Sequence, residues 1–140
     1  MSAKAFIDTN VLVYLFDSRV AVKQQRAAQL FEQLAAADDA PAISTQVIQE
    51  AFMALTRKLQ LDTREALALL RPLEQTGFTI QPIHAPLIWR AAERLIKDPL
   101  SFWDALIIEA ALESDCTILY SEDFQEGRSY GTLTVTNPFH

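Results

Sequence analysis

The 140-residue sequence contains only one cysteine, two histidines and three glycines. The single cysteine, Cys116, excludes a disulfide framework and a cysteine-based zinc site within the chain. Two histidines, His84 and His140, are too few for a histidine-rich metal site. The glycines are widely separated and form no GxGxxG fingerprint, P-loop or GxSxG elbow. Nucleotide binding through a glycine-rich loop is therefore excluded.

The sequence also has no long hydrophobic run. The apolar run at 11–16 is much shorter than the roughly 20 residues of a membrane-spanning helix. Asp8 interrupts the N-terminal region before a signal-like apolar stretch can develop. We therefore expect a soluble, cytoplasmic protein with no membrane segment.

Positive charge is scarce as well. Twelve lysines and arginines stand against 18 aspartates and glutamates, which gives a net charge of −6 and a pI near 4.8. Because nucleic-acid-binding domains are usually basic, this balance argues against binding of DNA or RNA by a generic basic surface. The objection weakens if acidic residues share a metal site, because two divalent cations would bring the net charge from −6 to −2.

The remaining composition is that of an ordinary globular protein, with 50% hydrophobic and 21% charged residues, and predicts one domain over residues 1–140. Amphipathic helical patterns separate short strand-like runs. The strand-like runs are 4–7, 41–44, 78–83, 116–120 and 132–135. The helical patterns lie around 27–35, 47–55, 62–76, 88–96 and 101–113. This alternation predicts an α/β fold, an α/β/α sandwich with a central parallel sheet.

Four acidic residues lie close to the ends of these elements. Asp8 ends the first strand, and Asp123 follows the 116–120 strand by a short turn. Glu50 lies near the start of the helix after the second strand, and Asp104 in the first turn of a later helix. Ligands of open parallel sheets bind beyond the carboxyl ends of the strands. Carboxylates that converge there repel one another, so Mg²⁺ or Mn²⁺ would be the natural counter-charge.

Each of these acids also has a structural explanation. Asp8 could cap the following helix, and Ser101 with Asp104 matches a capping box. Asp123 could belong to ordinary turn chemistry. Taken singly, each acid is more often structural than functional, and the functional hypothesis depends on the four together.

Helical spacing separates Asp104 from Glu50. Asp104 shares the buried stripe of Ile107 and Ile108, where a carboxylate should be paired or metal-bound. Glu50 lies on the flank of its helix, in line with Arg57. A flank position is typical both of a solvated residue and of one that lines a groove.

Five segments together resemble the PIN domain, the nuclease fold of the VapC-type toxins of type II VapBC toxin–antitoxin pairs. The segments are 6–13 (FIDTNVLV), 44–50 (STQVIQE), 102–108 (FWDALII), 118–124 (ILYSEDF) and 135–139 (VTNPF). The resemblance implies a parallel sheet of strand order 3-2-1-4-5. It also implies metal-dependent endoribonuclease activity that leaves a 5′-phosphate and a 3′-hydroxyl.

The acidic positions of the family fall on Asp8, Glu50, Asp104 and Asp123. The resemblance implies that Asp8, Asp104 and Asp123 are ligands of Mg²⁺ or Mn²⁺. Glu50 would be either a further ligand or the group that orients the attacking water. Either one ion or two would be compatible with these residues.

Polar neighbours of these acids also match the family. Thr9 and Asn10 fall on the polar positions after the first aspartate, and Ser121 on the small polar position before the last one. Glu122, beside Asp123, leaves two carboxylates as candidates for facing the metal in this loop. We favour Asp123 and expect Glu122 to point outward.

An RNA substrate needs positive charge near the acids, and Arg57 is the predicted substrate-binding residue because it shares a helix stripe with Glu50. The other basic candidates are Lys23, Arg26, Lys58 and Arg64. Trp103 could stack on a base, although an aromatic residue at such a position is more often part of the core.

The resemblance further implies a small VapB-like antitoxin partner and a homodimer. Two alternatives remain: a PIN-family RNA-processing nuclease outside a toxin–antitoxin pair, and a non-catalytic module that binds RNA or protein. A phospho-receiver domain and a haloacid-dehalogenase-type phosphatase fit less well. The receiver needs paired acids after its first strand and the phosphatase needs Asp-x-Asp, whereas this chain has Asp8-Thr9-Asn10.

Overall fold

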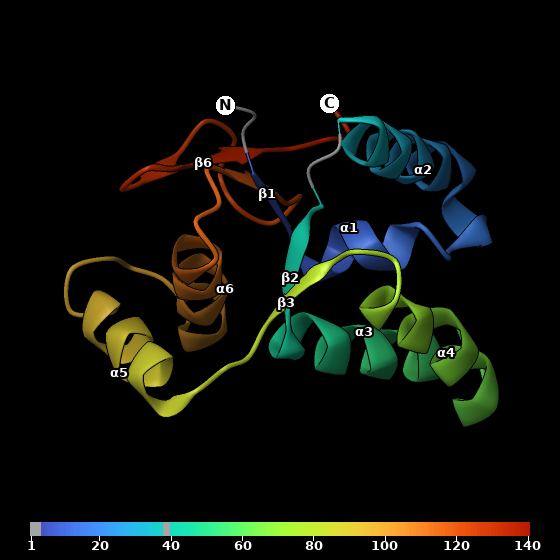
Figure 1. Ribbon diagram of the computed structural model, residues 1–140, viewed down its shortest axis with the longest axis horizontal. Helices are drawn as coiled ribbons and strands as arrows, with labels where there is room; N and C mark the ends of the chain where they lie inside the picture. Colours follow the sequence, from blue (N-terminus) through green and yellow to red (C-terminus); the bar gives the residue numbers. More distant parts are fainter. Residues whose placement is uncertain (1–3, 38–39) are drawn as a thin grey trace.

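A computed structural model describes residues 4–37 and 40–140. Its strands form one sheet of order β3-β2-β1-β4-β6-β5, with helices on both sides (Figure 1). The strands are β1 (Ala5–Ile7), β2 (Ala42–Ser44), β3 (Thr79–Gln81), β4 (Ile118–Tyr120), β5 (Ser129–Tyr130) and β6 (Leu133–Thr136). All neighbouring pairs are parallel except β5 and β6, which are antiparallel.

The predicted α/β sandwich and its strand order are confirmed, with β6 as the fifth parallel strand. The edge strand β5 was not predicted. It pairs Ser129 with Thr134 and Tyr130 with Leu133 around a turn in which Gly131 has a φ of +61°. A two-residue strand is too short to produce an alternating pattern in the sequence.

The helical elements are α1 (Thr9–Tyr14), η1 (Ser18–Val20), α2 (Ala21–Ala36), α3 (Thr45–Arg57), α4 (Thr63–Leu70), η2 (Arg71–Glu74), α5 (Ala85–Arg94) and α6 (Phe102–Glu113). The six-residue helix α1 was not among the predicted helical patterns, although Asp8 was considered as the cap of a following helix. The helix expected over 62–76 ends at Leu70 and continues as the 3₁₀ turn η2. Pro72 explains this break, because it lacks the N–H that a continuing α-helix would need there.

The core lies between the sheet and these helices. The central strands bury Phe6, Ile7, Ile43 and Leu119 completely, and α6 is buried along 105–111. In Figure 1, α5 and α6 lie on one side of the strands and α1 to α4 on the other. No helix of the described residues is both long enough and apolar enough to cross a membrane.

Three parallel strands bring their carboxyl ends to one edge of the sheet. Asp8 follows β1 directly, and its backbone N–H donates to the carbonyl of Tyr120 at the end of β4. Helix α3 starts directly after β2, where Ser44 caps it by accepting from the Val47 N–H. Segments that are distant in the sequence therefore meet at this edge.

Candidate active site

Asp8 lies at the centre of this edge and caps α1. Its Oδ1 accepts from the Thr9 N–H at 2.7 Å, and its Oδ2 accepts from the Ser121 hydroxyl at 2.7 Å. Asp8 is buried, with only 6% of its surface exposed. Burial raises the pKa of Asp8 to about 7; the bonds from Ser121 and Thr9 oppose this rise, and the charges of Asp123 and Glu50 add to it. Asp8 therefore both caps α1 and belongs to the group of acids.

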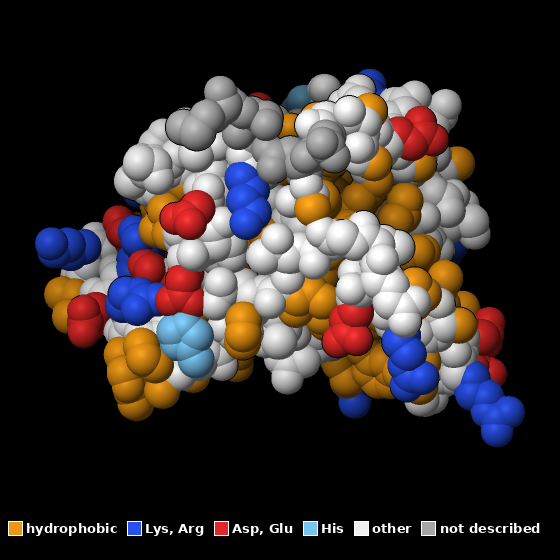
Figure 2. All heavy atoms as spheres, in the orientation of Figure 1, with side chains coloured by type: hydrophobic (Ala, Val, Ile, Leu, Met, Phe, Trp, Pro, Cys, Tyr) orange, Lys and Arg blue, Asp and Glu red, His pale blue; other side chains and the backbone are white. Residues whose placement is uncertain are grey.

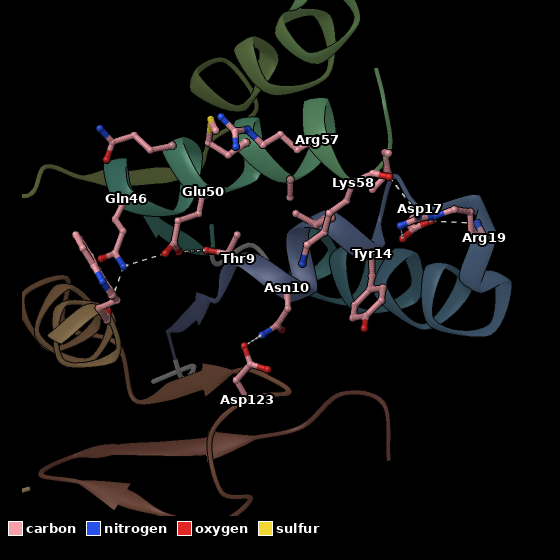
Figure 3. A pocket seen from close by; sticks show the side chains of 16 residues that line it. Thr9, Asn10, Tyr14, Asp17, Arg19, Gln46, Glu50, Arg57, Lys58 and Asp123 are labelled. Atoms are coloured by element: carbon pink, nitrogen blue, oxygen red, sulfur yellow. Dashed lines mark hydrogen bonds and ion pairs between the residues drawn. The ribbon is translucent and has the colours of Figure 1, made fainter. Parts of the chain in front are cut away.

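Glu50 projects from α3 toward the start of α1 (Figure 3). Its Oε1 accepts from the Thr9 hydroxyl at 2.7 Å, and its Oε2 lies 3.5 Å from the Gln46 amide nitrogen. That same nitrogen donates to the carbonyl of Trp103 at 3.1 Å. Gln46 therefore links the helix that carries Glu50 to the start of α6, which carries Asp104.

Sequence analysis assigned no role to Gln46, which precedes Glu50 by four residues. The spacing of four residues on one helix was a signal that the two side chains could touch. Nothing in the sequence indicated that Gln46 also reaches Trp103, 57 residues away.

Asp104 lies in the first turn of α6 and is half-buried. The Ser101 hydroxyl caps the helix by accepting from the Asp104 N–H at 3.1 Å. Burial raises the pKa of the Asp104 carboxyl, and the charges of Asp123 and Glu50 raise it further. A hydrogen bond from Ser101 opposes this rise without cancelling it. Asp104 thus lies in the electric field of the other acids as well as at a helix cap.

Asp123 is exposed and faces α1. Its Oδ2 accepts from the Asn10 amide nitrogen at 2.8 Å, and its backbone N–H donates to the Ser121 hydroxyl at 3.1 Å (Figure 3). The Asn10 amide oxygen accepts from the Glu122 N–H at 3.3 Å. Asn10 therefore holds both the side chain and the backbone of this loop.

Glu122 points away from the other acids. Its carboxylate accepts from the Tyr14 hydroxyl at 2.8 Å and forms an ion pair with Lys23. Burial acts to raise the pKa of Glu122, but the bonds from Lys23 and Tyr14 outweigh it and the pKa is lowered. Of the two neighbouring acids, only Asp123 contributes charge at Asp8 and Asp104.

A cavity of about 790 Å³ lies beside the acids. Glu50 and Asp123 line one part of it, and Arg57 and Lys58 line another part, toward the end of α3 (Figure 3). The rest of the lining includes Thr9, Asn10, Arg19, Gln46, Met53 and Trp103. Asp8 and Asp104 are not among its lining residues. The cavity therefore joins an acidic part to a basic part.

The other basic candidates are placed elsewhere. Lys23 is paired with Glu122, and Arg26 donates to the carbonyl of His140 at 3.3 Å. Arg64 lines a separate hollow over α4 and η2. Arg19, which sequence reasoning did not single out, lines the main cavity and is paired with Asp17. The basic part of the cavity thus consists of Arg57 and of Lys58 just beyond the end of α3, with the paired Arg19 as a third basic lining residue.

Trp103 is not part of the core, so the interpretation of this residue as a core aromatic is wrong. It is 62% exposed and lines the cavity. Its position at the second residue of α6 leaves the indole outside the buried stripe that starts at Ala105.

The donor set of the site suits a hard divalent cation, because Asp8, Glu50, Asp104, Asp123 and Asn10 all offer oxygen atoms. None of the four acids forms an ion pair with a lysine or arginine of the described residues. Within residues 4–37 and 40–140, no three histidine, cysteine, aspartate or glutamate side chains are arranged to hold one metal ion. Mg²⁺ usually binds through one or two carboxylates and keeps several waters, so the residues fit a hydrated ion.

Comparison with known proteins adds a family. The sequence model of the PIN domain family matches residues 5–125. No curated protein sequence matches the chain.

Solved structures share the fold. VapC20 of Mycobacterium tuberculosis, described as a sarcin-ricin loop cleaving toxin, is 22% identical with a TM-score of 0.68 over 86% of this chain and 90% of its own. A toxin–antitoxin complex from Klebsiella pneumoniae contains a chain that is 24% identical, with a TM-score of 0.67 over 96% and 98%. A chain of VapBC2 from Rickettsia felis, bound to a promoter DNA fragment, is 19% identical with a TM-score of 0.68 over 95% and 97%.

Proposed function

The chain belongs to the PIN domain family, and from this premise we propose that it is a metal-dependent endoribonuclease. The observation that carries the proposal is a group of four carboxylates in which the charges of Asp123 and Glu50 act on both Asp8 and Asp104, and which has no cationic partner among the described residues. Burial and neighbouring carboxylates raise the pKa of Asp8 and of Asp104, so the ionised forms of these residues cost the fold stability. Such perturbed carboxylates are typical of functional sites.

In this proposal Asp8, Asp104 and Asp123 would hold hydrated Mg²⁺ or Mn²⁺, partly through the water molecules that the ion keeps. The bound ion would lower the pKa of a water molecule and shield the charge of the phosphodiester. Ser121 orients Asp8 by a hydrogen bond, and Asn10 orients Asp123. Both donors are neutral, so they fix the carboxylates without cancelling the charge that attracts the ion.

Glu50 orients the attacking water and accepts its proton. Thr9 holds Glu50 Oε1 at 2.7 Å, whereas Oε2 has only the long 3.5 Å contact with Gln46 and is available for the water. The water oxygen bonds to phosphorus while the bond from phosphorus to the 3′-oxygen breaks, and the leaving 3′-oxygen takes up a proton from a solvent water. The products are a 5′-phosphate and a 3′-hydroxyl.

We propose that RNA lies along the cavity, with Arg57 contacting a phosphate beyond the scissile one. Arg57 lies two helical turns from Glu50 on the same helix, a rise of about 10 Å. Lys58 lines the same part of the cavity. Two cations there would offset the repulsion between the acidic chain and the polyanion.

Cleavage of RNA by the purified protein tests the nuclease proposal. We expect cutting with Mg²⁺ or Mn²⁺, none with EDTA, and loss of cutting in Asp104→Asn. Asp115→Asn is the matched control, because Asp115 is exposed at a φ of 60° that asparagine tolerates. RNA binding without cutting, unchanged by Asp104→Asn, would instead favour the non-catalytic module.

We also propose that the nuclease is the toxin of a VapBC-type pair. The likeness in fold to three toxin or toxin–antitoxin structures supports this proposal over a processing enzyme. Expression of the chain alone should arrest growth, and Asp8→Asn should abolish the arrest. Equal arrest by both forms would contradict a catalytic cause, and no arrest by an active nuclease would favour RNA processing.

A small VapB-like antitoxin is the proposed partner, with a basic side chain among the acids, and a homodimer is the proposed assembly. Ile96 exposes apolar surface on which a second copy could pack. Light scattering of the purified chain across a dilution series tests the dimer. A mass of one chain at every concentration would contradict it.

A further inference from the structure

Trp103 exposes a large apolar side chain at the edge of the acidic site. It immediately precedes Asp104 and lines the same cavity as Glu50 and Asp123. The other tryptophan, Trp89, is exposed to the same degree, 64% against 62%, but does not line this cavity. The chain therefore contains an exposed indole at the site and a matched one away from it.

Trp103 has one contact at its main chain and one at its ring. Gln46 donates to its carbonyl, and the ring of Phe102 packs edge-on against the indole at 5.5 Å. The Gln46 side-chain nitrogen faces the Trp103 carbonyl and the Glu50 carboxylate, which can only accept hydrogen bonds. These two acceptors determine which end of the Gln46 amide is the nitrogen and which is the oxygen. A fixed aromatic surface loses little conformational entropy when a ligand packs on it.

The same amide leaves an unsatisfied acceptor beside Trp103. Gln46 is 95% buried, and its Oε1 has no hydrogen-bond partner among the described residues. A buried acceptor without a donor is unfavourable. Every nucleobase carries N–H groups on its edge, which are donors of the kind that this oxygen lacks.

The charges of the cavity distinguish between possible ligands. Arg57 and Lys58 line it beyond the acids, away from Gln46 (Figure 3). An aromatic face for a base together with cations for phosphates is the usual arrangement for single-stranded nucleic acid. On the basis of the proposed ribonuclease function, we propose that Trp103 stacks on a nucleobase next to the scissile phosphate, with the base edge toward Gln46.

Fluorescence tests the stacking directly. Trp89→Phe leaves Trp103 as the only tryptophan, and Trp103→Phe leaves Trp89. In EDTA, which prevents cutting, a short single-stranded oligoribonucleotide should quench the emission of the first variant and leave that of the second unchanged. An abasic oligonucleotide of equal length should not quench either. Equal quenching by the abasic strand would overturn the proposal, because phosphates alone would then explain it.

Kinetics give a second readout that does not depend on fluorescence. Trp103→Leu should raise KM for RNA by about 5- to 150-fold, the range that corresponds to one stacked base. The value of kcat should stay within about twofold, and Trp103→Phe should recover most of the affinity because it keeps an aromatic face. Trp89→Leu is the matched control and should leave KM unchanged.

The outcomes separate this inference from the function on which it rests. Metal-dependent cutting that Asp104→Asn abolishes, with KM unchanged in Trp103→Leu and no quenching, would overturn the stacking and leave the nuclease intact. Absence of metal-dependent cutting would overturn the proposed function. Trp103 emission that responds to protein concentration and not to RNA would overturn the stacking in favour of a contact with a second copy.

Discussion

Two groups of carboxylates on this small protein have opposite surroundings. At the carboxyl edge of the sheet, the carboxylates of Asp8, Glu50 and Asp123 accept from neutral donors. Within the part of the chain that the structure describes, neither these three acids nor Asp104 forms an ion pair. Where α5 packs on α6, Glu109 and Glu113 instead have cationic partners. Figure 2 shows acidic and basic side chains intermixed over this side of the molecule.

The paired group is a continuous network. Glu109 contacts Arg94 at 2.8 Å and Arg90 at 3.7 Å. Glu113 is bonded to Arg90 and His84. This network joins two helices that pack along their length, so its charges support the structure.

The pKa directions express the difference. Burial acts to raise the pKa of Glu113, but the bonds from His84 and Arg90 reverse the effect and lower it. For Asp8 and Asp104, burial and neighbouring carboxylates act together, and the pKa is raised. The protein can evidently neutralise its acids, so a group left without cations indicates a site that reserves its charge for a ligand.

The largest effect on cleavage is expected when the two adjacent acids of the loop after β4 are neutralised one at a time. Asp123→Asn should reduce cleavage by more than about 100-fold, since it removes a proposed ligand and not merely an outer partner. Glu122→Gln should stay within about tenfold, because Glu122 contacts Tyr14 and Lys23. Cleavage rates and Mn²⁺ affinity measure both, and a reversed order would assign the metal to Glu122.

Removal of one acid from each group should separate stability from function. Glu109→Ala should lower the free energy of unfolding by about 1–3 kcal/mol, because Arg94 loses the nearer of its two carboxylate partners in a largely buried pair and keeps only Asp98 at 3.3 Å. Glu50→Ala should change it by less than about 1 kcal/mol, since it also relieves repulsion. Urea denaturation without metal measures the two values. Similar losses of stability in both variants would contradict the proposed difference between the two groups of carboxylates.

The pH dependence of stability should reveal Asp8. Its folded pKa of about 7 lies above the ordinary 3.8, so its ionisation destabilises the fold progressively as pH rises from about 4 to 7. At pH 8 without metal, Asp8→Asn should therefore be more stable than the natural chain by about 1–3 kcal/mol. At pH 3 the difference should vanish.

Added Mg²⁺ provides the control for that measurement. Binding to the folded state should stabilise the natural chain at pH 8 and stabilise Asp8→Asn much less. A natural chain that gains stability between pH 4 and 7 relative to the variant would contradict the raised pKa of Asp8.

The smallest effect is expected from Arg57. Arg57→Ala should raise KM for RNA by about three- to tenfold at constant kcat, because one exposed cation contributes little. The slope of log affinity against log salt is negative, and it should become shallower by about 0.7, the amount for one phosphate contact on a single strand. Arg64→Ala is the matched control, since Arg64 lines a different hollow, and equal effects would indicate a diffuse field.

Local signals in the sequence were sufficient for most of the fold. Asp62 and Glu65 have the spacing of a capping box, and the structure contains both of its bonds, at 2.8 and 3.2 Å. The strand-like run that contained Pro82 became β3, which ends at Gln81 on the edge of the sheet. Such signals depend on neighbours within a few residues, so they survive in a single sequence.

Long-range contacts could not be predicted in the same way. Lys23 and Arg26 looked like candidates for RNA binding, but contacts with Glu122 and His140, about a hundred residues away, occupy them. Trp103 looked like a core residue because helical spacing does not show where a helix rises out of the core at its first turn.

The sequence by itself determined the alternation of strands and helices, the caps, and an acidic residue near the end of several elements. Each of these depends on local backbone preference and hydrophobic periodicity. Only the tertiary structure decided which acids would lack cations, that Gln46 would connect α3 to α6, and that Arg57 and Trp103 would share one cavity with Glu50. Pairing and exposure depend on which distant surfaces meet, and packing of the sheet determines those meetings.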